Sequence, residues 1–230
     1  EVYTSKNEFE SFPLFDGLSV AEFYSKLFEI FQKLNIAVKI IAEPYDVPAE
    51  KKPFAEINNF HFYQAEYVER FWKILVWVSQ VFNKFSGRCY SKTSPVQLYW
   101  HHMDLTVTRF SGKKAPELPE EASTANKDAY SHEVISFGFW AGDEKMRGGA
   151  FYSYTYPSPA ELNKQPLKPA TASWVDNNGS PMALLMYDDI YDKSNPEDLL
   201  LDFMESAYTA GASLAGWNID DLKVPDLKDL

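Results

Sequence analysis

Two long segments of the chain, residues 97–110 and 130–141, change side-chain character at every second residue. Neighbouring side chains of a β-strand point to opposite faces, so this period of two predicts strands with two different faces. Shorter segments of the same kind follow at 149–157, 168–175 and 182–187, separated by turns rich in Gly, Pro, Asn and Asp. The sequence therefore predicts a mostly antiparallel sheet of five or more strands.

Three other segments repeat their apolar residues at helical spacing. The first, at about 20–34, begins beside Ser19 and Glu22, which match a capping box for exposed backbone N–H groups. The second spans about 64–85, and the third starts at 195–197 with Asn at the N-cap and Pro after it. Three main helices packed on one side of the sheet give an α+β fold.

The part of the chain between the first two helices carries a weaker signal. The β-branched segment Ile36–Ile41 predicts a short additional strand, and residues 43–62 read as a long loop. We expect one α+β domain over residues 1–230. The chain starts at Glu1 without an initiator Met, which indicates either processing or a missing upstream segment.

The amino-acid composition limits which partners and which cellular compartment are expected. The chain has 22 Lys and Arg against 33 Asp and Glu, a formal charge of −11, and an acidic surface repels nucleic-acid phosphates. No apolar run approaches the ~18 residues of a membrane span, so no membrane partner is expected. Cys89 is the only cysteine and no export signal is present, which favours a cytoplasmic protein. Phosphate-loop, dinucleotide-binding and nucleophile-elbow motifs are absent, so no cofactor is expected, and nothing indicates an oligomeric state.

The two faces of the predicted strands differ in chemistry. One collects apolar side chains and reads as the core beneath the helices: Met103, Leu105, Val107, Ile135, Phe137, Phe139 and Phe151. The other collects aromatic rings with polar tips, imidazoles and a carboxylate: Trp100, His102, Asp104, Tyr130, His132, Trp140, Tyr152, Tyr154 and Tyr156. Such side chains are typical of a small-molecule pocket, although a solvated face or a face covered by another segment would look the same.

Asp104 and His132 share this second face. A carboxylate beside an imidazole can orient it, so we hypothesise that His132 acts as acid or base and that Asp104 orients it. A purely structural hydrogen bond between the two is the alternative. His102, Asp104 and His132 could also ligate a metal, but no zinc-binding motif is present and no metal is predicted.

Two charged residues, Arg109 and Glu133, fall on the apolar face. Buried ions must be paired, so the simplest prediction is a salt bridge that joins their strands. Alternatively, Arg109 opens toward Ser111 and holds an anionic group of a ligand. The candidate ligand-binding residues are therefore Trp100, Arg109, Ser111, Tyr130, Glu133, Trp140 and Tyr154.

Several segments together resemble a bacterial family catalogued as a domain of unknown function. They are Phe71-Trp72, Ser94-Pro95-Val96, 104–112 (DLTVTRFSG), 129–134 (AYSHEV), Gly138-Phe139-Trp140, 150–157 (AFYSYTYP) and Ala215-Gly216-Trp217. The resemblance extends from about Ser19 to Trp217 and implies no activity. It implies only that seven residues occupy signature positions: Asp104, Arg109, Ser111, Tyr130, His132, Glu133 and Trp140.

The chain also departs from that family. His101 and His102 stand where similar proteins have small residues, which counts against a shared metal site. The resemblance implies extra sequence before the part matched by residues 2–18, and strands there could cover the aromatic face.

Two hypotheses for function follow. The first is a protein that binds a small molecule at the aromatic, His-bearing strand face, with or without catalysis. The second is a non-catalytic interaction or assembly module that docks a protein on the same face. A concave pocket would favour the first hypothesis, and a flat apolar patch larger than ~400 Å² the second.

Overall fold

The computed structural model describes residues 1–45, 51–100 and 102–225. The chain separates into two compact units, Glu1–Lys73 and Ile74–Leu230, with the division inside helix α2 (Ala65–Ser86). Helices and antiparallel sheets occur together, so the predicted α+β class is confirmed. The expectation of a single domain stays a prediction. None of the helices in the described ranges has the length and apolarity to cross a membrane.

The first unit is organised around one capped helix. Its elements are β1 (Val2–Tyr3), β2 (Phe9–Glu10), α1 (Val20–Lys33), the 3-10 turn η1 (Phe54–Glu56) and the start of α2. Helix α1 begins where predicted because the Ser19 hydroxyl accepts from the Glu22 N–H and the Glu22 carboxylate accepts from the Ser19 N–H. These bonds satisfy two backbone groups that the first helical turn leaves without partners.

The strand predicted over Ile36–Ile41 is wrong. The segment is irregular, and Ile41 is 82% exposed. β-propensity expresses packing against a neighbouring strand, and within the described part of the chain these residues pair with none. Their β-branched side chains therefore do not produce a ladder.

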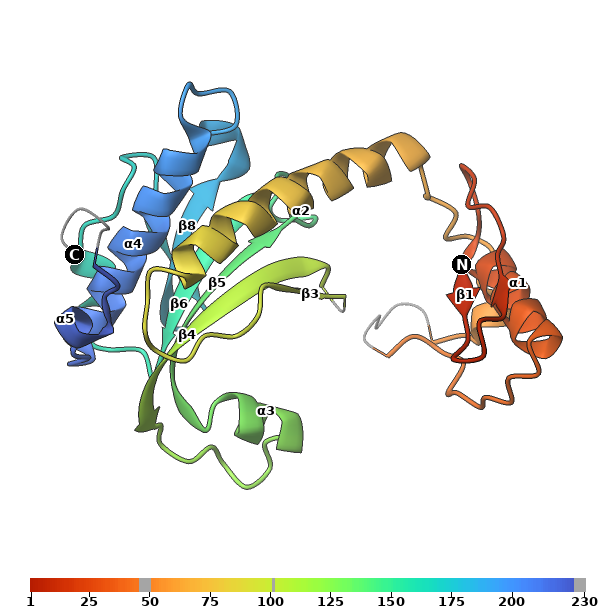
Figure 1. Cartoon of the computed structure of the whole chain (residues 1–230), viewed down its shortest axis with the longest axis horizontal. Helices are drawn as coiled ribbons and strands as arrows, with labels where there is room; N and C mark the ends of the chain where they lie inside the picture. Colours follow the sequence, from red (N-terminus) through yellow and green to blue (C-terminus); the bar gives the residue numbers. More distant parts are fainter. Residues whose placement is uncertain (46–50, 101, 226–230) are drawn as a thin grey trace. The chain divides into compact units, whose positions relative to one another are not determined.

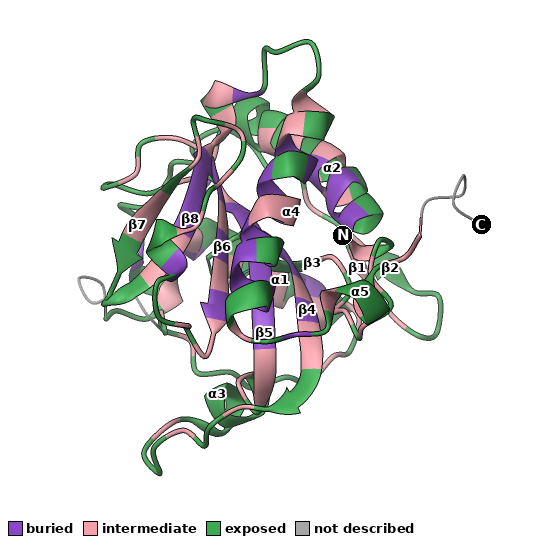
Figure 2. Ribbon diagram, turned by 90° about the vertical axis from the view of Figure 1, so that its left-hand side faces the viewer, coloured by how far each residue is buried: buried purple, intermediate pink, exposed green. Residues whose placement is uncertain are grey.

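The second unit is built on one antiparallel sheet, whose strand order is β3-β4-β5-β6-β8-β7 (Figures 1 and 2). Its strands are β3 (Gln97–Tyr99), β4 (Asp104–Lys114), β5 (His132–Trp140), β6 (Ala150–Tyr156), β7 (Ser173–Asn177) and β8 (Ser180–Met186). The strands predicted over 130–141, 149–157 and 182–187 are confirmed as β5, β6 and β8. The strand predicted over 168–175 starts later, as β7.

The single strand predicted over 97–110 is wrong. The structure divides it into β3 and β4, which form a hairpin in which Tyr99 lies opposite Asp104. Met103 takes a left-handed φ of 56°, which allows the chain to reverse without a glycine. Trp100 and His102 therefore belong to a turn, and the alternation of faces begins only at Asp104.

One face of the sheet is the core, as predicted. Helices α2 and α4 (Pro196–Leu214) cover it, and buried residues line both the strands and the inner side of α4 (Figure 2). The Phe85 ring of α2 packs edge-on against Phe137, with centroids 4.7 Å apart. The predicted core residues are buried except Met103, which is 45% exposed in the hairpin turn. The third long helix, α1, belongs to the first unit, so α2 and α4 form the layer on this face.

Short elements complete the second unit. They are α3 (Thr124–Ala129), η2 (Leu162–Lys164), η3 (Tyr187–Asp189) and α5 (Ile219–Leu222). Helix α3 starts at Ser123, whose hydroxyl accepts from the Asn126 N–H at 3.1 Å. It lies beyond the ends of β4 and β5 that are farthest from the hairpin turn (Figure 1).

Candidate functional site

The sheet face turned away from α2 and α4 carries the candidate site. We call it the tyrosine face, and it consists of Asp104, Thr106, Thr108, Phe110, Val134, Ser136, Gly138, Tyr152, Tyr154 and Tyr156. The register aligns these residues in rows across β4, β5 and β6. One row is Thr106, Gly138 and Tyr152, and the next is Thr108, Ser136 and Tyr154. The predicted sharing of a face by alternate residues is confirmed for these three strands.

A cavity of about 560 Å³ lies on the tyrosine face. Its floor comes from β4, β5 and β6, and its walls come from β3, α3 and the segment before β3. The residues around it are Ser94, Tyr99, His102, Asp104, Thr106, Thr108, Phe110, Asn126, Ala129, Tyr130, Val134, Ser136, Tyr152 and Tyr154. This volume falls within the range of small-molecule pockets, about 300–1,000 Å³.

The floor is shaped by a side chain that crosses a strand. Tyr152 extends from β6 over Gly138 of β5, and its hydroxyl donates to Oδ2 of Asp104 on β4. A methyl group at residue 138 would lie 2.2 Å from Cζ of Tyr152. Glycine in the middle of a strand is therefore needed here because another side chain occupies the space of a Cβ.

A second tyrosine lies beside the first. The rings of Tyr152 and Tyr154 are 6.4 Å apart between centroids and only 10° from parallel. The Tyr154 hydroxyl is 3.4 Å from that of Tyr130, which follows α3, and the ring of Tyr130 packs against Tyr156. The hydroxyls of Thr108 and Ser136 are paired at 2.9 Å. The floor therefore presents aromatic rings and linked hydroxyl groups together.

The tyrosines of the floor stay protonated at neutral pH. Burial raises the pKa of the Tyr152 hydroxyl, and its hydrogen bond to the Asp104 carboxylate raises it further. Burial also raises the pKa of the Tyr154 hydroxyl, and Tyr130 adds to the effect. Both groups can therefore serve a ligand as neutral partners: the Tyr152 oxygen can accept a hydrogen bond while its O–H is donated to Asp104, and the Tyr154 hydroxyl can donate or accept.

Five of the residues that the sequence placed on the aromatic face meet at this cavity: His102, Asp104, Tyr130, Tyr152 and Tyr154. Trp100 and Trp140 do not line it. Trp100 is 85% exposed in the hairpin turn, and Trp140 is the last residue of β5.

The predicted pairing of Asp104 with His132 is wrong. Leu105, which follows Asp104, lies opposite Phe139, whereas His132 lies opposite Lys114. Asp104 and His132 therefore occupy opposite ends of the β4–β5 ladder. Eight residues of strand separate their levels, about 27 Å at ~3.4 Å per residue.

The Nδ1 atom of His132 is instead 3.0 Å from the Ser131 hydroxyl. His132 borders a different hollow of about 640 Å³, formed by residues 114–120, Lys127 and 130–132. The alternative metal set of His102, Asp104 and His132 is not assembled either.

The predicted salt bridge between Arg109 and Glu133 is not formed. Arg109 is 1% exposed, and its Nη2 donates to the Phe85 carbonyl at 2.5 Å. Its Nη1 lies 3.6 Å from Oε2 of Glu205 on α4, and its guanidinium stacks 3.5 Å from the centre of the Phe85 ring. Glu133 accepts a hydrogen bond from Ser111 at 2.8 Å.

Arg109 has the environment of a structural cation. Burial lowers the pKa of its guanidinium, and Glu205 opposes that effect. It borders a separate hollow of about 630 Å³ beside α5, together with Arg88, Cys89 and Lys223. The anion-binding role proposed for Arg109 stays a prediction, and it concerns that hollow rather than the tyrosine face.

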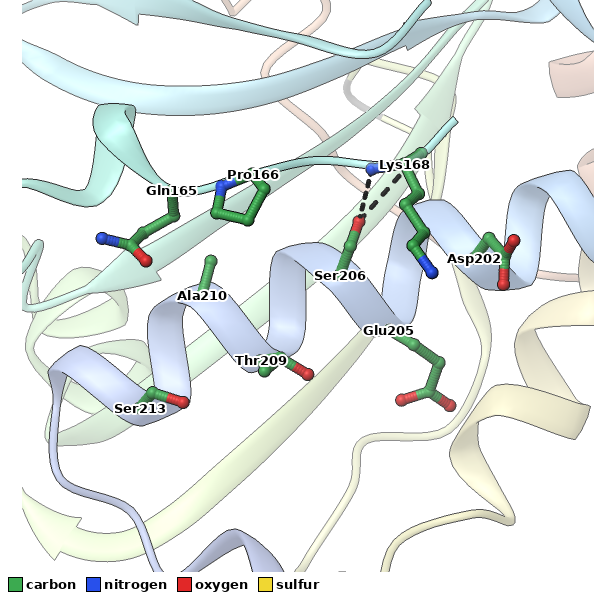
Figure 3. Close-up of a pocket in the computed structure, with 9 residues that line it drawn as sticks. All are labelled: Gln165, Pro166, Lys168, Asp202, Glu205, Ser206, Thr209, Ala210 and Ser213. Atoms are coloured by element: carbon green, nitrogen blue, oxygen red, sulfur yellow. Dashed lines mark hydrogen bonds between the residues drawn. The ribbon is translucent and has the colours of Figure 1, made fainter. Parts of the chain in front are cut away.

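Another hollow, of about 370 Å³, follows the outer side of α4 (Figure 3). Its residues come from α4 and from the segment 165–168. The Lys168 N–H donates to the Ser206 hydroxyl at 3.0 Å, which fastens this segment to the helix. Asp202, Thr209 and Ser213 of α4 are exposed there, and Glu205 and Ser206 are partly buried (Figure 3). This hollow is a packing seam between a helix and a loop.

Sequence reasoning missed several residues of the cavity. Gly138, which lies beneath Tyr152 and does not line the cavity, carried a usable signal, because glycine inside a strand indicates a close approach by another group. Thr106 and Thr108 share the parity of Asp104 and could have been included on that ground. Asn126 and Ser94 come from segments with no such periodicity, so nothing local indicated them.

The comparisons with known proteins bear on identity rather than on chemistry. The model of a family of unknown function, DUF5996, matches residues 1–224. The chain belongs to DUF5996. A search of curated proteins found no match, and a search of solved structures also found none. Membership in DUF5996 confirms the resemblance to a family of unknown function, and the site of this DUF5996 protein must be interpreted from its own residues.

Proposed function

We propose that this protein binds a small molecule in the cavity of the tyrosine face. The observation that carries the proposal is the floor itself, where the Tyr152 hydroxyl is bonded to the Asp104 carboxylate and the Tyr154 hydroxyl lies 3.4 Å from that of Tyr130. Partly enclosed polar groups among aromatic rings are what fixes the orientation of a small ligand. Gly138 leaves the room through which Tyr152 reaches the Asp104 carboxylate at this floor.

The shape of this face favours the small-molecule hypothesis over the docking hypothesis. A docking surface is typically flat and apolar at its centre. The tyrosine face is hollowed, and hydroxyl, amide and carboxylate groups from at least three elements surround the hollow. The geometry supports binding; an acid–base role for the pair Asp104 and His132 has no support, because their side chains occupy different ends of the ladder.

The proposal is tested by blocking the mouth of the cavity. Asn126 is exposed on α3 and lines the cavity, so Asn126→Trp would fill the entrance without disturbing the core. Asp128 is exposed on the same helix and is not a lining residue, so Asp128→Trp is the matched control. Thermal-shift screening with neutral, cationic and anionic metabolites should reveal compounds that stabilise the wild type and Asp128→Trp but not Asn126→Trp. If no compound stabilises the wild type, or if both variants respond equally, the proposed function is wrong.

A further inference from the structure

The charges around the cavity are unusual for a pocket of this size. Asp104 is its only carboxylate, and among the described lining residues there is no Lys or Arg. Among the described lining residues, His102 is the one with a basic side chain, and it lies on the hairpin turn at the rim. Five aromatic rings surround the space, those of Tyr99, Phe110, Tyr130, Tyr152 and Tyr154.

We propose that the ligand of this cavity is a small organic cation, with a primary or quaternary ammonium group. The inference rests on the proposed function and specifies its ligand. Aromatic rings attract cations through the negative electrostatic potential of their faces, and tyrosine is among the rings used for this purpose. Asp104 supplies the full negative charge. Among the described residues, the Tyr152 hydroxyl is the one hydrogen-bond partner of its carboxylate. A carboxylate has about four acceptor positions, so Asp104 can accept further bonds from an ammonium group.

An anionic ligand would meet the negative charge of Asp104, although one cation lies against the lining: Nζ of Lys92 is 5.0 Å from the centre of the Phe110 ring. Asp104 and the ring faces are negative, and the chain carries a formal charge of −11. Three other cationic side chains of this unit, Arg88, Arg109 and Lys223, border the separate hollow beside α5, together with Glu205 and Asp220. That hollow therefore has both cationic and anionic groups, whereas Asp104 is the one carboxylate among the described residues that line the cavity of the tyrosine face.

A metal ion fits the cavity less well than an organic cation. Stable sites for divalent ions use about four to eight ligands. Among the residues that the structure describes, no cluster of three or more His, Cys, Asp or Glu side chains is arranged to hold an ion. The tyrosine hydroxyls, whose pKa values are raised, remain neutral and make poor substitutes for carboxylates.

The test uses pairs of compounds that have nearly the same shape and differ in charge. Choline is paired with 3,3-dimethylbutan-1-ol, in which carbon replaces the quaternary nitrogen. 2-Phenylethylammonium is paired with 2-phenylethanol. Titration calorimetry on the full chain should show that at least one cation binds about tenfold or more tightly than its neutral partner, the ratio that a cation–π contact and one ion pair can supply.

Two variants connect the effect to named residues. Asp104→Asn keeps an oxygen that can accept from Tyr152, so the fold is retained while the charge is lost, and cation affinity should fall about tenfold. Asp128→Asn makes the same change in net charge outside the cavity, and cation affinity should stay within about twofold. Tyr130→Phe should retain cation binding and Tyr130→Leu should weaken it, because only the first keeps the ring.

The outcomes separate the two proposals. Neutral partners that bind as tightly as the cations, or an Asp104→Asn variant with unchanged cation affinity, would overturn the cationic ligand. The cationic ligand is also overturned if only neutral or anionic compounds bind and Asn126→Trp weakens their binding. In that case the proposed function survives. If no cationic, neutral or anionic compound binds, both proposals fail.

Discussion

The hydroxyl of Tyr152 on β6 donates a hydrogen bond to Asp104 on β4, although β5 lies between their two strands. The bond is possible because β5 has Gly138 at the crossing point, where a methyl group would lie 2.2 Å from Cζ of Tyr152. Neighbouring strands are ~4.8 Å apart, so the side chains of Tyr152 and Asp104 together bridge two strand intervals. One glycine thus leaves the room for the Tyr152 ring at the floor and for its hydrogen bond to Asp104.

The first prediction concerns Gly138→Ala. The new methyl group should displace the end of the Tyr152 side chain and break its hydrogen bond to Asp104. Hydrogen bonds to charged groups contribute about 1.5–3 kcal/mol, so the free energy of unfolding in urea should fall by about that amount. Tyr152→Phe, which removes the hydroxyl and keeps the ring, is the control. If Gly138→Ala unfolds at the wild-type urea concentration, Tyr152 does not depend on this glycine.

The second prediction concerns alkaline pH. Burial raises the pKa values of Tyr152 and Tyr154, and that of Tyr208 to about 12, whereas tyrosine in an unfolded chain titrates near pH 10. Above pH ~10 the unfolded chain loses protons that the folded protein keeps. The stabilisation is therefore complete below pH ~10 and declines as the pH rises, by about 1.4 kcal/mol per pH unit for each tyrosine.

Urea unfolding between pH 9 and about 11.5 measures this slope. Tyr154→Phe removes one of the three groups, so its stability should decline less steeply by about 1.4 kcal/mol per pH unit. An identical slope for wild type and Tyr154→Phe would show that Tyr154 does not keep its proton in the folded state.

Part of the candidate site could be read from the sequence because strand alternation is a local property. Once β4, β5 and β6 form, parity alone decides that Asp104, Tyr152 and Tyr154 share a face. The same parity separates them from the buried residues Ile135 and Phe137. These predictions needed no knowledge of which strands are neighbours.

Parity gives no position along a strand, and this explains the failure of the Asp104–His132 pair. The register places Leu105 opposite Phe139, and that alignment is decided by packing and by the connection through α3 rather than by alternation. The sequence also did not indicate the hairpin between β3 and β4, because its turn has no typical turn residue at the left-handed position. Met103 adopts a left-handed φ without the Gly or Asn that usually marks such a turn.

Arg109 illustrates a third limit. The sequence correctly requires a partner for a charge on the core face, because an isolated buried ion is costly. The partner, Glu205, comes from a helix almost a hundred residues later, so only the packing of α4 on the sheet reveals it. Glu133, the nearer candidate by sequence, has Ser111 as its partner.

The third prediction compares two arginines that contact the same carboxylate. Arg109 is buried, whereas Arg88 is exposed and lies 3.4 Å from Glu205. Arg109→Ala should lower the free energy of unfolding by about 3–5 kcal/mol, because it opens a cavity and leaves the Phe85 carbonyl without its donor. Arg88→Ala should cost less than about 1 kcal/mol, as exposed ion pairs usually do. Similar losses for both variants, measured by denaturant unfolding, would contradict the structural role assigned to Arg109.

The fourth prediction concerns the close approach of α4 to the sheet at Gly211. A methyl group there would lie 2.2 Å from Oγ1 of Thr155 and 3.1 Å from Cδ1 of Ile135, both on the core face. Alanine improves helix propensity by about 1 kcal/mol, but overpacking costs about 1–3 kcal/mol, so Gly211→Ala should be destabilising by about 1 kcal/mol.

Two further variants decide whether packing is the cause of that loss. Ser213→Ala makes a substitution on the exposed side of α4 and should leave the free energy of unfolding within about 0.5 kcal/mol of wild type. Thr155→Ala removes the atom nearest to the new methyl group, so the double variant should be more stable than the sum of the two single changes predicts. Strict additivity would mean that the helix and the sheet do not touch at this point. The core face would then not hold β5 and β6 at the positions from which Gly138 and Tyr152 form the floor of the cavity.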